Sequence, residues 1–321
     1  MNYVELEWRW AMVLGAALGA GLVEAVAREK KTADGLAAEL GLDGRAVYTV
    51  MSALSELGVV DESGEGYLLR EEHRGPLLDP EKPGYAGGRV IHRFEVMAKW
   101  ATLPEILLTG RPAEDRTVPR FAGTETMARA IRAGSKESAD EVSALVLPRL
   151  PKNPRILDVG GGSGANAESF AVKGASVTVL DRPEVFSVNG GFLLELGVEL
   201  VPGDMNVALP EGPFNCVYLG NTSHMYGPDE NRALFAKMYD ALAPGGYAVV
   251  REFVRGLSGD VAGEAALFAV NMLVLTSRGG TYTEGEYRGW LEEAGFPDVE
   301  FLPIAGRTTA LIFARKPVSG V

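Results

Sequence analysis

Apolar residues recur at helical intervals in the first part of the chain and in short strand-like runs in the rest. Residues 11–23 form an apolar stretch rich in Gly and Ala, which predicts a buried, closely packed helix. Segments 34–40 and 43–57 predict two more helices, because Thr32 or Asp34 and then Asp43 provide N-caps and a glycine follows each helix. A Gly-rich turn between two apolar runs then predicts a β-hairpin. Together these elements predict a winged-helix plan.

A second helical region, residues 84–147, precedes a proline-rich connector and a change of pattern. Apolar strands are then predicted at 155–159, 176–180, 198–201, 216–219 and 247–250, with helices between them. Alternating strands and helices predict a doubly wound α/β fold, Rossmann-like, with a mostly parallel sheet. Two last runs, 299–303 and 309–314, predict a C-terminal antiparallel hairpin. We therefore divide the chain into a mainly α domain, 1–100, which includes the start of the helical linker, and an α/β domain, 101–321.

The charge of the chain decides whether the winged-helix plan indicates nucleic-acid binding or a packing module. The 321 residues carry a formal net charge of −12, which disfavours a polyanionic partner. Residues 1–75 hold 7 Lys and Arg against 13 Asp and Glu, and the helix at 43–57 carries Arg45 as its only cation. A helix that enters the major groove needs several donors for phosphates and base edges. The pattern favours a packing or dimerisation module and no nucleic-acid partner.

Composition also limits the compartment and the type of site. A single cysteine, Cys216, and three histidines favour neither a disulfide framework nor a zinc cage, and they suit a reducing cytoplasm. The apolar stretch 11–23 is too short for a bilayer, which needs roughly 20 residues. Because Glu5 and Glu7 precede that stretch, it is also a poor secretory signal. We expect a cytoplasmic protein with no membrane span and no metal.

The sharpest motif is ILDVGGGSG at residues 156–164, after the first predicted strand of the α/β region. Glycines allow a tight turn and a close approach to a ligand, and the next helix presents free amide groups. Gly160, Gly162 and Ala165 also satisfy the alanine variant of the dinucleotide-binding fingerprint. The loop alone therefore does not choose between a dinucleotide and another nucleoside ligand.

Asp158 distinguishes between a dinucleotide and a positively charged nucleoside ligand. A carboxylate at the mouth of this loop would repel a diphosphate, whereas it would attract the sulfonium and ammonium groups of S-adenosylmethionine. A structural aspartate that binds the loop's own amides is compatible with both ligands. On charge, the sequence favours S-adenosylmethionine.

Three further signals follow in order along the chain. Asp181, directly after the second strand, can accept hydrogen bonds from both ribose hydroxyls, although an exposed turn aspartate has the same setting. After the third strand, the Asp204 carboxylate can bond an adenine amino group and Met205 can pack on the ring face. Residues 243–246, Ala-Pro-Gly-Gly, predict a stop between a helix and the next strand. The predicted cofactor-binding residues in these motifs are Asp158, Gly160, Gly162, Asp181, Gly203, Asp204 and Met205.

With these motifs the chain resembles the class I S-adenosylmethionine-dependent methyltransferases, specifically the small-molecule O-methyltransferases of the plant caffeate and bacterial polyketide-tailoring type. The resemblance extends over nearly the whole chain, from the winged-helix start to residues 287–296. It implies that Gly160 and Gly162 lie against the methionine portion of S-adenosylmethionine, Asp181 at the ribose, and Asp204 with Met205 at the adenine. It also implies a small-molecule acceptor and a homodimer whose N-terminal domains interlock and help to close each other's substrate pocket.

The same resemblance implies a catalytic base. His224, in the loop after the fourth strand, stands where the family has a histidine that deprotonates the acceptor hydroxyl, and a histidine titrates in a suitable range. Glu252 matches one acidic partner of that histidine, whereas Thr281 stands near the place of a second, a glutamate in plant members. Asn221, in the His224 loop, is a further candidate for the cofactor. A purely structural role of His224, as a cap or a bond within its loop, stays open.

We therefore predict an S-adenosylmethionine-dependent methyltransferase that acts on a small aromatic or polyketide-like acceptor, at oxygen. C- or N-methylation of a small acceptor such as a keto acid, a non-catalytic regulator that senses S-adenosylmethionine, and a dehydrogenase are the alternatives. Candidates for the acceptor pocket are Met97, Trp100, Phe121, Met127, Phe268 and Met272, although apolar residues at helical spacing are more often core.

Overall fold

The structure, a computed structural model, describes residues 1–321 except for residues 4, 81, 83, 113–123, 258–262 and 319–321. The chain divides into two compact units. The first consists of Met1–Ala101 and Glu114–Gly134, and the second of Thr102–Ala113 and Ser135–Val321. The helix α8 (Thr124–Val146) belongs to the first unit at its beginning and to the second at its end.

The first unit is mainly helical and holds the predicted hairpin. Its elements before α8 are α1 (Trp8–Gly19), α2 (Leu22–Arg28), α3 (Ala33–Leu40), α4 (Gly44–Glu56), β1 (Val60–Ser63), β2 (Gly66–Leu69), α5 (Glu71–Leu78) and α6 (Gly87–Trp100). Thr32 and Asp43 cap α3 and α4, each accepting a backbone hydrogen bond, at 3.1 and 2.9 Å, so these predicted helix starts are confirmed. The predicted helix at 11–23 is wrong in its extent, because Gly21 adopts a φ of 79° and the chain turns there between α1 and α2.

No single helix among the described residues is long and apolar enough to cross a bilayer. Among the described helices, α1 and α2 pass the test of length and composition as a pair, and they are bent by 66° relative to each other.

The second unit is built on one seven-stranded sheet with the order β10-β11-β7-β6-β3-β4-β5. Its strands are β3 (Arg155–Val159), β4 (Ser176–Asp181), β5 (Glu199–Pro202), β6 (Phe214–Gly220), β7 (Leu242–Glu252), β10 (Asp298–Pro303) and β11 (Ala310–Arg315). The five strands from β3 to β7 pair in parallel, and β10 and β11 are antiparallel. Because β3 lies between β4 and β6, the order in which the chain adds strands to the sheet reverses direction at β3. The predicted doubly wound sheet is confirmed.

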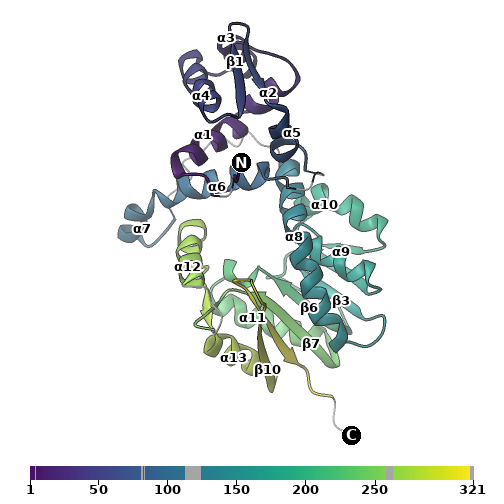
Figure 1. The fold of residues 1–321 in the computed structure, drawn as a ribbon. Helices are drawn as coiled ribbons and strands as arrows, with labels where there is room; N and C mark the ends of the chain where they lie inside the picture. The colour runs from purple at the N-terminus through teal and green to yellow at the C-terminus, as the bar shows by residue number, and fades with distance from the viewer. Residues whose placement is uncertain (4, 81, 83, 113–123, 258–262, 319–321) are drawn as a thin grey trace. The chain divides into compact units, whose positions relative to one another are not determined.

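Helices cover both faces of this sheet (Figure 1). The remaining elements of the second unit are α7 (Leu103–Thr109), a 3-10 turn at Leu147–Arg149, α9 (Ala165–Val172), α10 (Pro183–Glu195), a 3-10 turn at Ser223–Met225, α11 (Pro228–Ala241), β8 (Val254–Arg255), α12 (Glu264–Leu275), β9 (Tyr282–Thr283) and α13 (Glu284–Glu293). One core joins the sheet to α11 and α13, the other joins it to α8, α9 and α10. Successive strand residues enter opposite cores, as Leu157 and Ile156 do, because side chains alternate along a strand.

Two details differ from the sequence prediction. The predicted C-terminal hairpin is present, but β11 lies between β10 and β7 and continues the sheet antiparallel to β7. The predicted link at residues 243–246 is an irregular start of β7, since Leu242 already pairs with Phe214 before the register shifts. Gly245, at a φ of 78°, allows this irregular start.

Candidate active site

The glycine-rich loop lies at the switch point of the sheet, where β3 ends between β4 and β6. Gly160, Gly162 and Gly164 have φ angles of 69°, 54° and 78°, a left-handed conformation that strains residues with a Cβ. The Gly160 amide donates to the Leu180 carbonyl at 2.8 Å, and α9 begins directly after Gly164. Open α/β sheets bind ligands at such a point, beyond the carboxyl ends of the strands. The loop can therefore present backbone amides to a ligand there.

Asp158 lies beneath this loop rather than at its mouth. The side chain is 1% exposed, and its Oδ2 has no hydrogen-bond partner among the described residues. A Cβ added to Gly161 would lie 3.3 Å from this oxygen. Burial, and then the nearby carboxylate of Asp181, raise the pKa of Asp158 to about 7. The sequence predicts a charged carboxylate here, whereas burial favours the neutral form of this carboxyl group.

Asp181 bonds to the glycine-rich loop itself. Its Oδ2 accepts a hydrogen bond from the Gly162 amide at 2.8 Å, and its Oδ1 accepts one from the Arg182 amide at 2.8 Å. Each carboxylate oxygen has a second lone pair, so the side chain can still accept bonds from a ligand. Asp181 thus holds the loop in position and stands at the tip of β4, as the sequence predicts.

The candidates after β5 and β6 reach the same edge of the sheet. The Gly203 amide donates to the Asp181 carbonyl at 2.9 Å, which joins the ends of β4 and β5. Met205 is 9% exposed, and its terminal methyl lies 2.7 Å from the position that a Cβ on Gly160 would occupy. Asp204 is exposed, and its Oδ1 accepts two bonds from Asn206, at 2.8 and 3.0 Å.

Asn221 begins the His224 loop in a left-handed conformation, with a φ of 52°, and its amide donates to the Arg251 carbonyl at 2.9 Å. Asparagine tolerates this conformation better than most residues. The loop of β6 is therefore tied to the end of β7 by backbone geometry.

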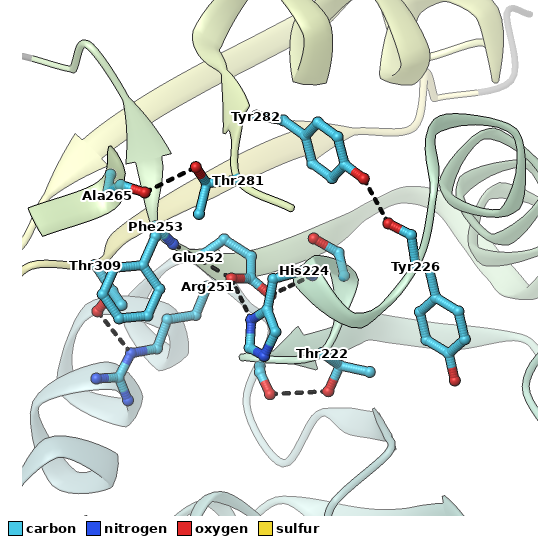
Figure 2. A network of polar contacts seen from close by, with 12 residues as sticks. Thr222, His224, Tyr226, Arg251, Glu252, Phe253, Ala265, Thr281, Tyr282 and Thr309 are labelled. Carbon is cyan, nitrogen blue, oxygen red and sulfur yellow. Dashed lines mark hydrogen bonds and ion pairs between the residues drawn. The ribbon is translucent and has the colours of Figure 1, made fainter. Parts of the chain in front are cut away.

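His224 and Glu252 form a buried pair at this edge of the sheet (Figure 2). His224 Nδ1 lies 2.9 Å from Glu252 Oε2, with the two side chains 10% and 0% exposed. The Glu252 carboxylate also accepts the backbone amides of His224 and Phe253, both at 3.3 Å. Because a carboxylate only accepts hydrogen bonds, Nδ1 carries the proton and Nε2 keeps a lone pair. A neutral imidazole held in this tautomer can take a proton at Nε2.

Aromatic residues form one side of the His224 environment. Phe268 on α12 meets the imidazole edge to face, with ring centres 4.9 Å apart, and it stacks on Phe253 at 4.0 Å. Met272, the other pocket candidate on α12, is 3% exposed and therefore core. Of the other pocket candidates, Met97 and Trp100 belong to the first unit, whereas Phe121 and the Met127 side chain lie outside the described residues.

Three polar residues that the sequence prediction did not single out hold the His224 loop. Asn231, fully buried on α11, donates from Nδ2 to the carbonyls of Ser223, Tyr226 and Gly227 at 3.1 to 3.2 Å. The Ser223 hydroxyl bonds the Tyr287 hydroxyl at 2.7 Å. No local pattern marks these residues, because their partners are side chains and carbonyls brought together by the fold. Thr281 does not contact His224 through a hydrogen bond; its hydroxyl donates to the Ala265 carbonyl at 2.8 Å.

Comparisons with known proteins identify the family of this chain. A family model described as an O-methyltransferase domain matches residues 125–297. The chain belongs to this O-methyltransferase family. It is 29% identical to a 3-hydroxy-5-methyl-1-naphthoate 3-O-methyltransferase of Streptomyces sahachiroi, over 93% of this chain and 89% of that protein.

The chain is also similar to a second relative in sequence and to a solved structure in fold. The chain is 29% identical to the tetracenomycin polyketide synthesis 8-O-methyl transferase of Streptomyces glaucescens, over 86% of this chain and 84% of that protein. Its fold matches that of human N-acetylserotonin methyltransferase in complex with S-adenosylmethionine, with a TM-score of 0.71, 23% identity and coverage of 97% and 94% of the two chains.

This O-methyltransferase family depends on S-adenosylmethionine, so the predicted enzyme class and cofactor are confirmed. The dehydrogenase alternative is thereby wrong. The reason is that the glycine fingerprint fits several nucleoside ligands, and its tertiary setting and the remaining motifs choose among them. The roles of individual site residues stay predictions.

Proposed function

We propose that this O-methyltransferase transfers a methyl group to a hydroxyl of a small aromatic or polyketide-like metabolite, with His224 as the general base. The observation that carries the proposal is the buried pair of His224 and Glu252, with Nε2 not bonded to any described residue, at the edge of the sheet where the glycine-rich loop ends. The names of the relatives, which act on a hydroxynaphthoate and in tetracenomycin synthesis, support an aromatic acceptor.

The residues at the sheet edge fit S-adenosylmethionine. The unpartnered Oδ2 of Asp158 can bind the ammonium group, which would restore the charge that burial disfavours. Gly160 and Gly162 hold the left-handed turns that let the loop backbone approach the methionine portion closely. We assign Asp181 to the ribose, and Gly203, Asp204, Met205 and Asn221 to the adenosyl portion. When bound, the cofactor supplies a methyl group on a positively charged sulfur.

His224 and Glu252 share the proton chemistry. Nε2 takes the hydroxyl proton of the acceptor, which makes the oxygen a stronger nucleophile toward the methyl group that the bound cofactor would supply. Glu252 holds the ring in the tautomer that can accept this proton, and its negative charge stabilises the imidazolium that forms. Phe268 and Phe253 limit the movement of the ring and keep this side of the site apolar. Orientation of acceptor and methyl group in line supplies the larger part of the rate enhancement.

Calorimetry and an acceptor screen test the proposal directly. The purified chain is expected to bind S-adenosylmethionine and S-adenosylhomocysteine but not NAD, and to methylate a phenolic compound in a mixed panel of phenols and keto acids. Mass spectrometry and NMR of the product would show whether oxygen carries the new methyl group. Methylation at carbon or nitrogen would contradict the hydroxyl assignment, and binding without turnover across a broad panel would favour a non-catalytic sensor.

The raised pKa of Asp158 predicts how cofactor affinity depends on pH. Because the ammonium binds the ionised carboxylate, the affinity for S-adenosylhomocysteine is expected to increase about 10-fold between pH 6 and pH 8, across the pKa of about 7. Titrations in buffers of different ionisation enthalpy should show a proton released on binding. Asp158→Asn should remove this pH dependence, whereas Asp298→Asn, an exposed control at the start of β10, should keep it. An affinity that is constant over this pH range would contradict the ammonium assignment.

We also propose that residues 1–100 form a dimerisation domain and that residues 101–321 form the catalytic domain, as predicted from the sequence. The homodimer and the lack of a nucleic-acid partner stay predictions. The homodimer rests on the family resemblance, and the lack of a nucleic-acid partner rests on the acidic charge of residues 1–75 and on Arg45 as the only Lys or Arg of α4. Size-exclusion chromatography with light scattering that shows a monomer at micromolar concentration would contradict the dimer.

A further inference from the structure

Arg251 is a buried cation next to the catalytic pair, and the proposed chemistry leaves it without a role. It precedes Glu252 at the end of β7 and is 9% exposed. Its Nε donates to the buried hydroxyl of Thr309 on the loop before β11, at 3.1 Å. No carboxylate among the described residues lies within ion-pair distance of this guanidinium. A buried charge that has only a hydroxyl partner is costly unless a ligand completes its environment.

The carboxylate of Glu141 on α8 does not fill this gap. Both of its oxygens bond the Arg307 guanidinium, at 2.9 and 2.8 Å. That bond is the main cause of the lowered pKa of Glu141, to which the more distant Arg251 adds. Glu141 thus lies in the field of Arg251 while it bonds to Arg307, and no ion pair of Arg251 with a carboxylate is found among the described residues.

Tyr218 presents a second unused donor beside Arg251. The side chain is fully buried, and its hydroxyl has no hydrogen-bond partner in the described part of the chain. Burial raises the pKa of Tyr218, and the Arg251 guanidinium opposes this effect, so the phenol stays protonated close to the cation. The hydroxyl lies at the end of β6, 2.6 Å from the position of a Cβ on Gly220. Gly220 pairs with Arg251 in the sheet, so the two donors lie at the same edge.

The strand neighbours of these donors belong to the two halves of the proposed site. Tyr218 pairs with Asp158 on one side, and Arg251 is covalently joined to Glu252 on the other. The side chains of Asp158, Tyr218 and Arg251 enter the same face of the sheet, since they share the register of Val249 and Leu311 in the core beneath α8 and α9. Figure 2 shows Arg251 extending from β7 beside the His224 and Glu252 pair, with Thr309 at its Nε.

We propose that Arg251, with the Tyr218 hydroxyl, binds a carboxylate of a ligand in this active site. A guanidinium offers paired N–H donors that match the two oxygens of a carboxylate, and a phenol can donate to the same group. The carboxylate is either the α-carboxylate of the cofactor or an acid group on the acceptor. The inference rests on the proposed function, because both ligands follow from it.

Two binding measurements on the full chain distinguish the sources. In the first, calorimetry compares S-adenosylhomocysteine with its decarboxylated analogue, in which a hydrogen replaces the carboxylate. In the second, with S-adenosylhomocysteine present, it compares a hydroxynaphthoic acid with the corresponding primary amide. We expect the wild-type chain to prefer the carboxylate about 10- to 100-fold in one of the two comparisons. Arg251→Gln should remove that preference by weakening the acid and leaving its carboxylate-free counterpart unchanged.

Three variants control for charge and folding. Tyr218→Phe should reduce the same preference about 2- to 10-fold without lowering the melting temperature, because its hydroxyl makes no described hydrogen bond. It keeps the test decisive if Arg251→Gln does not fold. Arg251→Lys keeps the charge and should retain part of the preference. Arg315→Gln removes an exposed arginine at the opposite end of β11 and should change neither comparison.

The results separate this inference from the function on which it rests. If the wild-type chain does not bind S-adenosylhomocysteine, the proposed function fails and takes the inference with it. If it binds, but neither Arg251→Gln nor Tyr218→Phe changes either carboxylate preference, only the inference is overturned.

Discussion

His224→Ala is expected to lower kcat by about 10²- to 10⁴-fold and to leave the dissociation constant of S-adenosylhomocysteine unchanged. The reason is that Nε2 is the group proposed to take the acceptor proton, while the glycine-rich loop and its carboxylates hold the cofactor. Stopped assays with mass detection give kcat, and calorimetry gives the dissociation constant. The loss should be smaller for acceptors with a more acidic hydroxyl, because these are already partly ionised.

Two further variants separate loss of the base from loss of structure. Alanine at position 224 leaves the buried Glu252 without its 2.9 Å partner, which costs stability as well. His224→Gln can still donate to Glu252 but cannot take a proton near neutral pH, so it should show a similar loss of kcat. His92→Ala, at an exposed position on α6, should keep full activity. A His224→Gln enzyme with wild-type kcat would remove His224 as the base.

Glu252→Gln is expected to lower kcat by about 10²-fold or more with little change in KM. The amide removes the negative charge that stabilises the imidazolium, and it can donate to Nδ1, which would place the ring proton on Nε2. Nitrogen NMR of the imidazole tests this cause, with Nδ1–H expected in the wild-type enzyme and Nε2–H gained in the variant. A residue needed only for folding would not change the tautomer in this way.

The coupling between the two residues gives an independent check. If Glu252 acts through His224, the double variant His224→Gln and Glu252→Gln should be no slower than His224→Gln alone. Glu264→Gln, the same change at an exposed position at the start of α12, serves as the matched control. A Glu252→Gln enzyme within threefold of wild-type kcat would contradict the positioning role.

The fold of the second unit was largely predictable, because its signals are local. Strand β3 has the predicted bounds, and β4 and β5 differ by about a residue. Apolar runs, glycines and N-caps report backbone conformation within a few residues, and parallel strands separated by helices leave few topologies. The insertion of β11 between β7 and β10 was not predictable in this way, because a hairpin pattern does not say which edge strand it joins.

The candidate site was predictable in its residues but not in its electrostatics. The sequence predicts a charged Asp158 carboxylate at the mouth of the loop, and the structure buries it beneath the loop, which raises its pKa to about 7. No local sequence pattern indicated that Asn231 would bind the carbonyls of the His224 loop, or that Arg251 and Tyr218 would lie close to the site. Each depends on partners that the strand order brings close.

By itself, the sequence determined the α/β class, the glycine-rich turn and the order of acidic residues at the strand ends, since each depends on short-range backbone preference and on chemistry repeated at fixed spacing. Only the tertiary structure decided which of these groups are buried and which tautomer Glu252 imposes on His224. It also placed close to this edge of the sheet a buried cation whose described partner is the Thr309 hydroxyl, and a phenol without a hydrogen bond among the described residues. These properties depend on desolvation and on register across the sheet, which are set by residues far apart in the chain.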